Sequence, residues 1–525
     1  MQTQLITSHR IKRKFSRREF IQYSLATGMT LAAAEGLWVK SARAEQIKGG
    51  HMGLALAGGS TTDTLEPTTY SDTVMLMLGF SVRGNLAEVM PDGSVKPELA
   101  ESFEPSEKGT KWQVKLRKGV QFSNGKSLTV DDVIKSLNLH RGEASKSAVK
   151  AMVEAISDVK ADGPDSLLFT LREGNADFPY ILADYHLNIM PFEGDQYDPK
   201  IGCGPFLLKS FEPGVRVILE RNPNSYKSAF IDSAELVVVT DPTARQSALQ
   251  GGSADIINRP DFATAQMLSE TAGIKVVDVN GRMHYTMPGD ARISPYNNTD
   301  FCTAMKFAIN REEILEKVLF GHGTIGNDSP ITPSYKYFAE DLKPRPYDLD
   351  KARFHLKKSG LEGAQVNLSA SDTAFGGADN AALLFAESAA KAGLKVNVIR
   401  EPADGYWDNV WLKKEFCMAY WGGRPTEDIQ LTSAYHSQAA WNETHWNNKQ
   451  FDDLLAAARS ETDDAKRRTM YHDLQHLIAN EGSTIIPIFA NHVHASTDKV
   501  VTPEKMSGAW ELDGGRCLER WSLAS

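Results

Sequence analysis

One short run, residues 420–428, combines aromatic, cationic and anionic side chains. It reads Tyr-Trp-Gly-Gly-Arg-Pro-Thr-Glu-Asp. The guanidinium of Arg424 presents its donors in a planar fork that fits a carboxylate or a phosphate bidentately. Glu427 and Asp428 offer carboxylates for a ligand or for an internal ion pair with Arg424. With Trp421 as an aromatic contact, these residue types predict the binding of a charged ligand.

Two further groups of residues are candidate ligand contacts. Tyr406 and Trp407 precede this run, and aromatic walls enclose ligands without requiring particular hydrogen bonds. An apolar stretch at 53–57 ends in two glycines and a polar turn that holds Thr61 and Asp63, and Tyr70 follows. A turn at the end of a strand can deliver polar side chains to a site. Each of these residues also fits a plain core or turn role.

The sequence lacks the motifs of a catalytic centre. It contains no G-x-S-x-G, H-E-x-x-H or G-x-x-x-x-G-K-[ST] pattern. His472 with His476, and His492 with His494, are spaced so that each pair shares a face, but a pair lacks the third ligand that most protein metal sites require. We therefore predict a binding protein that is not an enzyme, with no catalytic residue, no metal and no cofactor.

Composition and charge indicate a folded, acidic chain. Its 525 residues are 41% hydrophobic and 24% charged, which is ordinary for globular proteins and is enough for two to four domains or lobes. The 58 Lys and Arg against 67 Asp and Glu give a net charge of −9. No basic stripe is present to neutralise phosphates, so nucleic acid is excluded as a partner.

The first 44 residues have the build of an export signal. They carry eight Lys and Arg against two Glu, then a mildly apolar stretch, and end in small residues. Residues 16–21, Ser-Arg-Arg-Glu-Phe-Ile, resemble the twin-arginine motif, although an ordinary secretory signal with a chance arginine pair is the alternative. We predict cleavage after Ala44 and a periplasmic protein. The four well-separated cysteines are expected to be free and buried, although the periplasm permits disulfides.

The elements that must position these residues alternate between strands and helices. Strand-like runs occur at 215–219, 235–239, 274–279 and 396–399, and helix-like runs at 303–318, 349–359, 381–392 and 452–479. Residues 111–126 alternate in hydropathy and end in Asn-Gly, which predicts a hairpin. Thr129, followed by Asp131 and Asp132, predicts the start of a helix that runs through Leu139. This alternation favours an α/β fold.

Six blocks, in order, resemble the peptide-type, family 5 substrate-binding proteins of ABC importers. They include residues 112–133, the Gly-Cys-Gly-Pro-Phe turn at 202–206, Arg-Asn-Pro-Asn-Ser-Tyr at 221–226 and residues 249–256. Residues 304–314 and 347–352 match two helices of the second lobe. The resemblance therefore runs over nearly the whole chain after the signal.

This resemblance implies a two-lobed periplasmic-binding-protein fold with a hinge, in which the lobes close on the ligand. After the signal at 1–44, lobe one is expected at 45–88, 201–283 and 490–525, with an extra inserted subdomain at 89–200. Lobe two is expected at 284–489. The implied partners are a small solute and the inner-membrane ABC permease subunits, and the protein is expected to be a monomer.

The resemblance also implies a ligand site, with one departure from the family pattern. Trp421 falls on the family's cleft tryptophan, but Arg424 falls on the aspartate that pairs with a peptide's amino terminus. Glu427 or Asp428 is left to take the ammonium. We expect a short-peptide ligand. The alternatives are an anionic non-peptide solute, such as an opine or a sugar phosphate, and less plausibly a periplasmic hydrolase or metal-binding protein.

Overall fold

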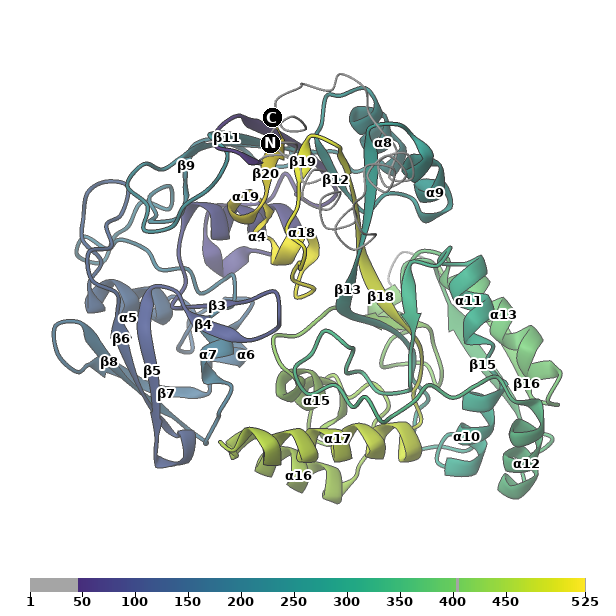
Figure 1. Cartoon of the computed structure of the whole chain (residues 1–525). Coiled ribbons are helices and arrows are strands. Elements are labelled where there is room, and N and C mark those ends of the chain that lie inside the picture. The colour runs from purple at the N-terminus through teal and green to yellow at the C-terminus, as the bar shows by residue number, and fades with distance from the viewer. Residues whose placement is uncertain (1–45, 403–405, 525) are drawn as a thin grey trace, which may run out of the picture.

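Two long antiparallel strands connect the two lobes of the molecule. The computed structural model describes residues 46–402 and 406–524, so the predicted signal and its cleavage site lie outside the described residues. In Figure 1, β13 (Ile274–Met287) and β18 (Ile485–Thr497) run from the upper lobe into the lower one. Their ladder shifts register between Asn280 and Met283. Because such an irregularity bends a strand, the bend falls where the chain passes from one lobe to the other.

One mixed sheet extends through both lobes because β13 and β18 take part in each of them. Its order is β17-β13-β18-β12-β2-β11-β10-β9, with β14 also paired to β18, and β2 runs parallel to both β11 and β12. The other strands are β2 (His51–Leu56), β9 (Phe206–Glu212), β10 (Arg216–Arg221), β11 (Ser233–Val238), β12 (Ile256–Asn258), β14 (Gly323–Ile325) and β17 (Ala419–Trp421).

Lobe one packs its helices against the β2 and β9–β12 side of this sheet. Helix α4 (Thr73–Val82) is buried along its whole length, which matches its apolar sequence. The short strand β1 (Gln46–Ile47) pairs with β20 (Ser522–Ala524), so the two ends of the described chain lie side by side (Figure 1). The remaining elements here are η1 (Pro67–Thr69), α8 (Pro242–Gln250), α9 (Phe262–Glu270), β19 (Val500–Val501), α18 (Glu511–Gly514) and α19 (Cys517–Arg520).

A separate antiparallel sheet with its own hydrophobic cluster lies at the left of Figure 1. Its order is β5-β6-β8-β7, and the proposed unit 89–200 encloses it. The elements in this part of the chain are β3 (Ala87–Val89), β4 (Val95–Pro97), β5 (Ala100–Ser106), η2 (Glu107–Gly109), β6 (Lys111–Leu116), α5 (Val130–Asn138), α6 (Lys150–Val153), β7 (Ile156–Ala161), β8 (Ser166–Leu171) and α7 (Phe178–Ile181).

Two predictions from local sequence fall in this region: a helix start at Thr129 and a hairpin at 111–126. The predicted helix start is confirmed, because Thr129 and Asp132 form a reciprocal capping box at α5. The hairpin prediction is right only for the turn. The Asn-Gly turn supports a single bridge between Gln121 and Ser127, whereas β6 pairs with β5 and β8. Long-range pairing of the apolar face of β6 decided its partners.

Lobe two holds the longest helices among the described residues. Its elements are α10 (Thr299–Ala308), α11 (Arg311–Lys317), α12 (Leu349–Ser359), β15 (Gln365–Ala370), α13 (Ala378–Ala390), β16 (Lys395–Arg400), α14 (Tyr406–Asn409), α15 (Glu427–Tyr435), α16 (Lys449–Ser460) and α17 (Asp464–Glu481). The predicted single helices at 303–318 and 452–479 are each two helices. In each case a side chain caps the start of the second helix. Asn310 accepts a hydrogen bond from the backbone amide of Glu313, and Asp463 accepts one from the backbone amide of Lys466.

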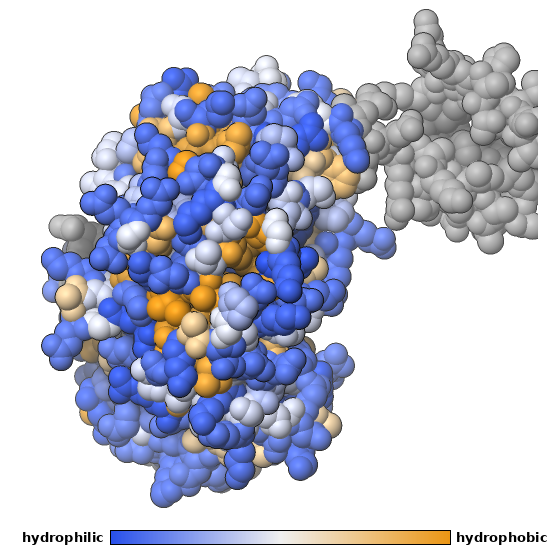
Figure 2. Space-filling view, turned by 90° about the vertical axis from the view of Figure 1, so that its left-hand side faces the viewer, coloured by the Kyte–Doolittle hydropathy of each residue, from blue (hydrophilic) through white to orange (hydrophobic). Residues whose placement is uncertain are grey.

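The surface and the buried thiols are ordinary for a globular protein. The face on the side of the β5–β8 sheet is mostly hydrophilic, with hydrophobic residues in small groups between polar ones (Figure 2). All four cysteines are free and buried. Among the described residues, no helix has the length and apolarity needed to cross a membrane.

Candidate ligand-binding site

A cavity of about 480 Å³ lies between the two lobes, beside the linking strands. Aromatic side chains line it from both sides: Tyr185 and Trp510 from lobe one, and Tyr285, Phe375 and Tyr420 from lobe two. The rings of Tyr285 and Phe375 stack with centroids 3.8 Å apart, and Tyr185 meets Trp510 edge-on at 5.6 Å. Such paired rings form rigid walls that suit a ligand that is apolar or that carries both apolar and polar groups.

Strand alternation places Tyr420, rather than Trp421, at the cavity. Neighbouring residues of a strand point to opposite faces, and β17 buries Ala419 and Trp421 while Tyr420 is 42% exposed. Trp421 lies in the core of lobe two, where its ring contacts those of Trp411 and Trp441. The predicted aromatic contact is therefore shifted by one residue along the strand.

The two aromatic residues before this strand pack behind the cavity without lining it. Tyr406 is buried in the core of lobe two and donates from its hydroxyl to the Met418 carbonyl at 2.8 Å. Trp407 is half-buried, and its ring meets that of Tyr420 at 5.5 Å. Trp407 thus props the cavity residue Tyr420, whereas Tyr406 holds the strand in place.

Glu427 and Asp428 have partners inside lobe two, in contrast to their predicted role as ligand carboxylates. Glu427 accepts from the backbone amide of Tyr337 at 2.5 Å, and Nε of Arg459 lies 3.0 Å from both oxygens of Asp428. Burial raises the pKa of Asp428 to about 6, against the opposing effect of Arg459. The reason for the difference is that Thr426 caps α15, which turns both carboxylates into the first turn of a buried helix.

The lobe-one candidates lie close to the cavity but do not line it. Thr61 is exposed in the turn after β2, and Asp63 accepts from the Ser60 amide at 2.6 Å within that turn. Tyr70 is buried and its hydroxyl binds Arg83. The chain reaches the cavity at the next residue, Ser71, and stays there through Asp72 and Thr73, where helix α4 begins.

Arg424 lies between the lobes, in a space of about 30 Å³ next to the larger cavity, with Asp184 and Trp510 of lobe one in the same lining. Its Nη1 donates to the Gly422 carbonyl at 3.2 Å, and its guanidinium lies over the Trp421 ring at 5.2 Å. Burial lowers the pKa of Arg424. Arg424 does not form the internal ion pair with Glu427 or Asp428 that the sequence allowed, because Glu427 binds the Tyr337 amide and Asp428 binds Arg459.

The two histidine pairs contact carboxylate and aromatic side chains. His472 and His476 both face the carboxylate of Asp341, at 3.4 and 2.9 Å. His492 lines the cavity, and burial lowers its pKa, while the ring of His494 lies against Trp521 at 5.1 Å. Within the described residues, no group of three or more His, Cys, Asp or Glu side chains is arranged to hold a metal ion.

A second contact joins the lobes away from the linking strands. Arg467 of α17 forms a two-pronged ion pair with Asp177, which precedes α7, at 2.8 and 2.7 Å. Both side chains are buried, and Arg467 lies over the rings of Tyr337 and Tyr471. The two lobes are thus joined by this ion pair as well as by the linking strands.

Sequence reasoning missed several lining residues. Tyr285 lies on a linking strand that was expected to end at Val279, and Tyr185 and Phe375 lie in loops that carry no periodic signal. Tyr420 could have been found, because the β17 segment alternates around it.

Comparison with known proteins identifies the family. The chain is 25% identical over 468 residues to the glutathione-binding protein GsiB of Escherichia coli (strain K12), covering 86% of this chain and 91% of the relative. The structure of the periplasmic binding protein DppA from Helicobacter pylori, in complex with the peptide STSA, aligns with TM-score 0.72 and 20% identity, over 93% of this chain and all of that chain.

A further solved structure, the binding protein AgaA of A. tumefaciens R10 in complex with agropinic acid, aligns with TM-score 0.72 and 20% identity over 91% of this chain and 99% of that one. Residues 94–443 match the model for bacterial extracellular solute-binding proteins, family 5. These likenesses agree with the two lobes and two linking strands seen here. The chain therefore belongs to family 5 of the bacterial extracellular solute-binding proteins.

Proposed function

We propose that this protein is the periplasmic substrate-binding subunit of an ABC importer and that its ligand is a short peptide. The observation that carries the proposal is the interlobe cavity of about 480 Å³ with aromatic walls from both lobes. Its size lies within the range of roughly 300–1,000 Å³ that is usual for small-ligand sites. A ligand held between aromatic walls draws binding energy from both lobes and so favours their closure.

The relatives support this assignment. GsiB is named for glutathione, a short anionic peptide, and DppA holds the peptide STSA. The protein acts as a monomer that delivers its ligand to the inner-membrane permease subunits. It has no catalytic role, because a binding subunit needs only to capture and release its solute.

A second candidate ligand is an anionic non-peptide solute such as an opine. Arg424 favours it, since a guanidinium between the lobes suits a ligand carboxylate better than a ligand ammonium. AgaA holds agropinic acid. Native mass spectrometry of the protein purified from the periplasm would identify a retained ligand and so decide between a peptide and an opine.

Lobe closure is a direct prediction of this function. Protein stripped of ligand by partial unfolding and refolding is expected to show a larger radius of gyration than protein refilled with its retained ligand, because ligand contacts favour the closed form. Small-angle scattering measures the difference. Identical profiles at verified saturation would contradict closure on the ligand.

Tryptophan fluorescence provides an independent reading of the same event. Trp510 lines the cavity, so ligand should change its emission. The Trp510→Phe variant is the matched control: the ligand-induced signal should shrink while the seven other tryptophans after residue 44 report an unchanged fold. A full signal in the variant would place the responding tryptophan elsewhere.

Export is predicted to depend on the arginine pair at 17–18. Replacing both arginines with lysine should leave precursor in the cytoplasm, because the twin-arginine route recognises that pair. Fractionation and immunoblotting measure the result. Unchanged export of the double-lysine variant would instead assign the chain to the general secretory route.

A further inference from the structure

Lobe one contributes one arginine to the wall of the cavity, and it lies outside the run 420–428. Arg259 follows strand β12 and lines the cavity together with Glu511. Its side chain is 56% exposed, whereas that of Glu511 is 16% exposed. The guanidinium therefore stays accessible from the cavity although its partner carboxylate is largely covered.

Glu511 is fixed by neutral donors as well as by the arginine. Its Oε2 accepts from Asn258 Nδ2 at 2.8 Å and from Thr73 Oγ1 at 3.1 Å, and its Oε1 accepts from Nε of Arg259. Burial raises the pKa of Glu511, but Arg259, His492 and Asn258 together hold that pKa below its usual value. A charged carboxylate held this way orients the guanidinium, which keeps further donors for a second acceptor.

The backbone at Arg259 is also constrained. Its φ is 45°, in the left-handed region that non-glycine residues seldom adopt. Its amide donates to the Val493 carbonyl at 3.0 Å, and its carbonyl accepts from Arg245 Nη2 at 2.7 Å. Such a conformation persists only where the surroundings fix it, and it is common at ligand-binding positions.

The charges around Arg259 indicate which anion it takes. Asp72 and Glu511 line the same cavity, so the charged side chains of lobe one there are one cation and two carboxylates. A doubly charged phosphate would be repelled by these two carboxylates, whereas a singly charged carboxylate is repelled less and fits the planar fork. Asp72 caps α4 through its Oδ1 and also interacts with the carboxyl of Asp63, so its side chain is already engaged within lobe one.

We propose that Arg259, oriented by Glu511, is the lobe-one anchor that binds a carboxylate of the ligand. This proposal rests on the proposed function and adds a specific contact to it. Arg424 of lobe two lines a separate, smaller space between the lobes. A ligand that Arg259 holds by its carboxylate and that also contacts lobe two favours closure as well as binding.

Calorimetric titration tests the anchor with probes of defined charge. Trialanine and glutathione are each titrated as the free acid and as the C-terminal amide, and inorganic phosphate is titrated alone. Wild-type protein is expected to bind at least one free acid about tenfold or more tightly than its amide. Arg259→Gln should abolish that ratio by weakening the acid and leaving the amide unchanged.

Matched controls separate anchoring from stability. Arg216→Gln replaces an arginine of β10 that pairs with Glu212 of β9, away from the cavity, and should keep the wild-type acid-to-amide ratio. Glu511→Ala leaves Arg259 in place but unoriented, so its ratio should fall to a value between those of wild type and Arg259→Gln. Circular dichroism melts of all variants verify folding.

Three results would overturn the proposal: an unchanged acid-to-amide ratio in Arg259→Gln, no binding of either free acid by wild-type protein, or tighter binding of phosphate than of either acid. The importer function is judged separately, by ligand retained through purification and by lobe closure. If a retained ligand closes both wild type and Arg259→Gln equally well, the anchor fails while the importer function stands.

Discussion

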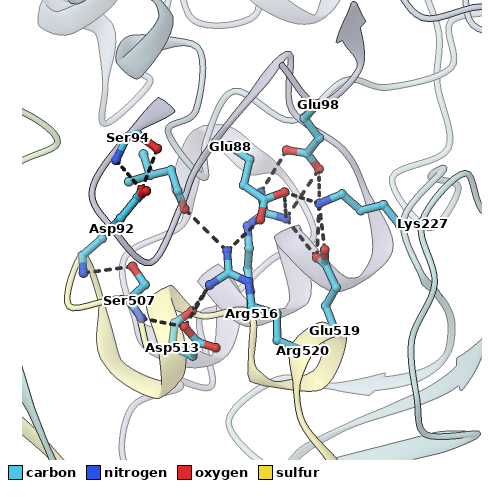
Figure 3. A network of polar contacts seen from close by, with 12 residues as sticks. Glu88, Asp92, Ser94, Glu98, Lys227, Ser507, Asp513, Arg516, Glu519 and Arg520 are labelled. Atoms are coloured by element: carbon cyan, nitrogen blue, oxygen red, sulfur yellow. Dashed lines mark hydrogen bonds and ion pairs between the residues drawn. The ribbon is translucent and has the colours of Figure 1, made fainter. Parts of the chain in front are cut away.

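Replacing Arg516 with methionine is expected to lower the free energy of unfolding by about 3–5 kcal/mol, because the change removes one partner from a buried ion network. Arg516 Nη2 lies 3.0 Å from Glu98 Oε2, and Nη1 lies 3.2 Å from Glu519 Oε2 (Figure 3). Its guanidinium also lies 4.1 Å from the centroid of the Phe80 ring. Methionine fills part of this volume but leaves the carboxylates short of positive charge. Chemical denaturation followed by circular dichroism measures the loss.

The network holds the C-terminal segment to distant parts of lobe one. Glu88 and Glu98 belong to the region of β3 and β4, and Lys227 precedes β11 (Figure 3). Arg516 directly precedes α19, and Arg520 is the last residue of that helix. Lys227 reaches Glu88, Glu98 and Glu519 at 2.6, 3.0 and 3.0 Å. Loss of Arg516 therefore exposes several carboxylates to mutual repulsion.

The effect should depend on pH. Burial raises the pKa of Glu88, but Arg516, Lys227 and Arg520 outweigh it and hold the pKa well below its ordinary value. A carboxyl whose pKa is lower in the folded state than in the unfolded state stabilises the folded protein, and this contribution is complete above the unfolded-state pKa, near 4.5. The contribution is lost as the pH falls towards the folded-state pKa. The stability gap between wild type and Arg516→Met should thus be full near pH 7 and shrink below about pH 4.5.

An exposed arginine provides the comparison. Arg216 pairs with Glu212 at 2.8 Å on the surface, and Arg216→Met should change stability little, because exposed pairs contribute little. Equal losses in the two variants, or a gap that grows at low pH, would contradict a stabilising role for the buried network.

Replacing Arg424 with alanine is expected to weaken binding of an anionic ligand at least tenfold. A hydrogen bond to a charged group contributes about 1.5–3 kcal/mol, and about 1.4 kcal/mol corresponds to one decade in affinity. The site favours this outcome because the guanidinium lies between the lobes and its hydrogen bonds go to the backbone carbonyls of Gly422 and Gly423. Calorimetry with the retained ligand measures the change.

Arg424→Lys should recover only part of the loss, since one ammonium cannot reproduce a two-pronged contact. The fold should survive both changes, and the melting temperature verifies this. Wild-type affinity in Arg424→Ala would mean that the side chain only covers Trp421 and the neighbouring carbonyls, and the case for an anionic ligand would then rest on Arg259 alone.

Local signals in the sequence predicted the elements well. The strand at 235–239 and the helix at 349–359 appear as β11 (Ser233–Val238) and α12 (Leu349–Ser359), and Thr129 caps α5 as expected. These features depend on periodicity and on contacts between near neighbours in the chain, which the order of residues determines directly. The ordered family blocks likewise predicted the two-lobed fold.

Partners distant along the chain were decided only by the tertiary structure. Sequence reasoning selected Trp421, Glu427 and Asp428 for the cavity, whereas the fold buries all three and presents Tyr420 there instead. Arg259 and Glu511 are 252 residues apart, and Arg516 and Glu98 are 418 apart. The sequence by itself determined the elements, the family and the residue types available for binding. Which side chains meet depended on how β13 and β18 cross between the lobes, because only that crossing brings distant turns to one cavity.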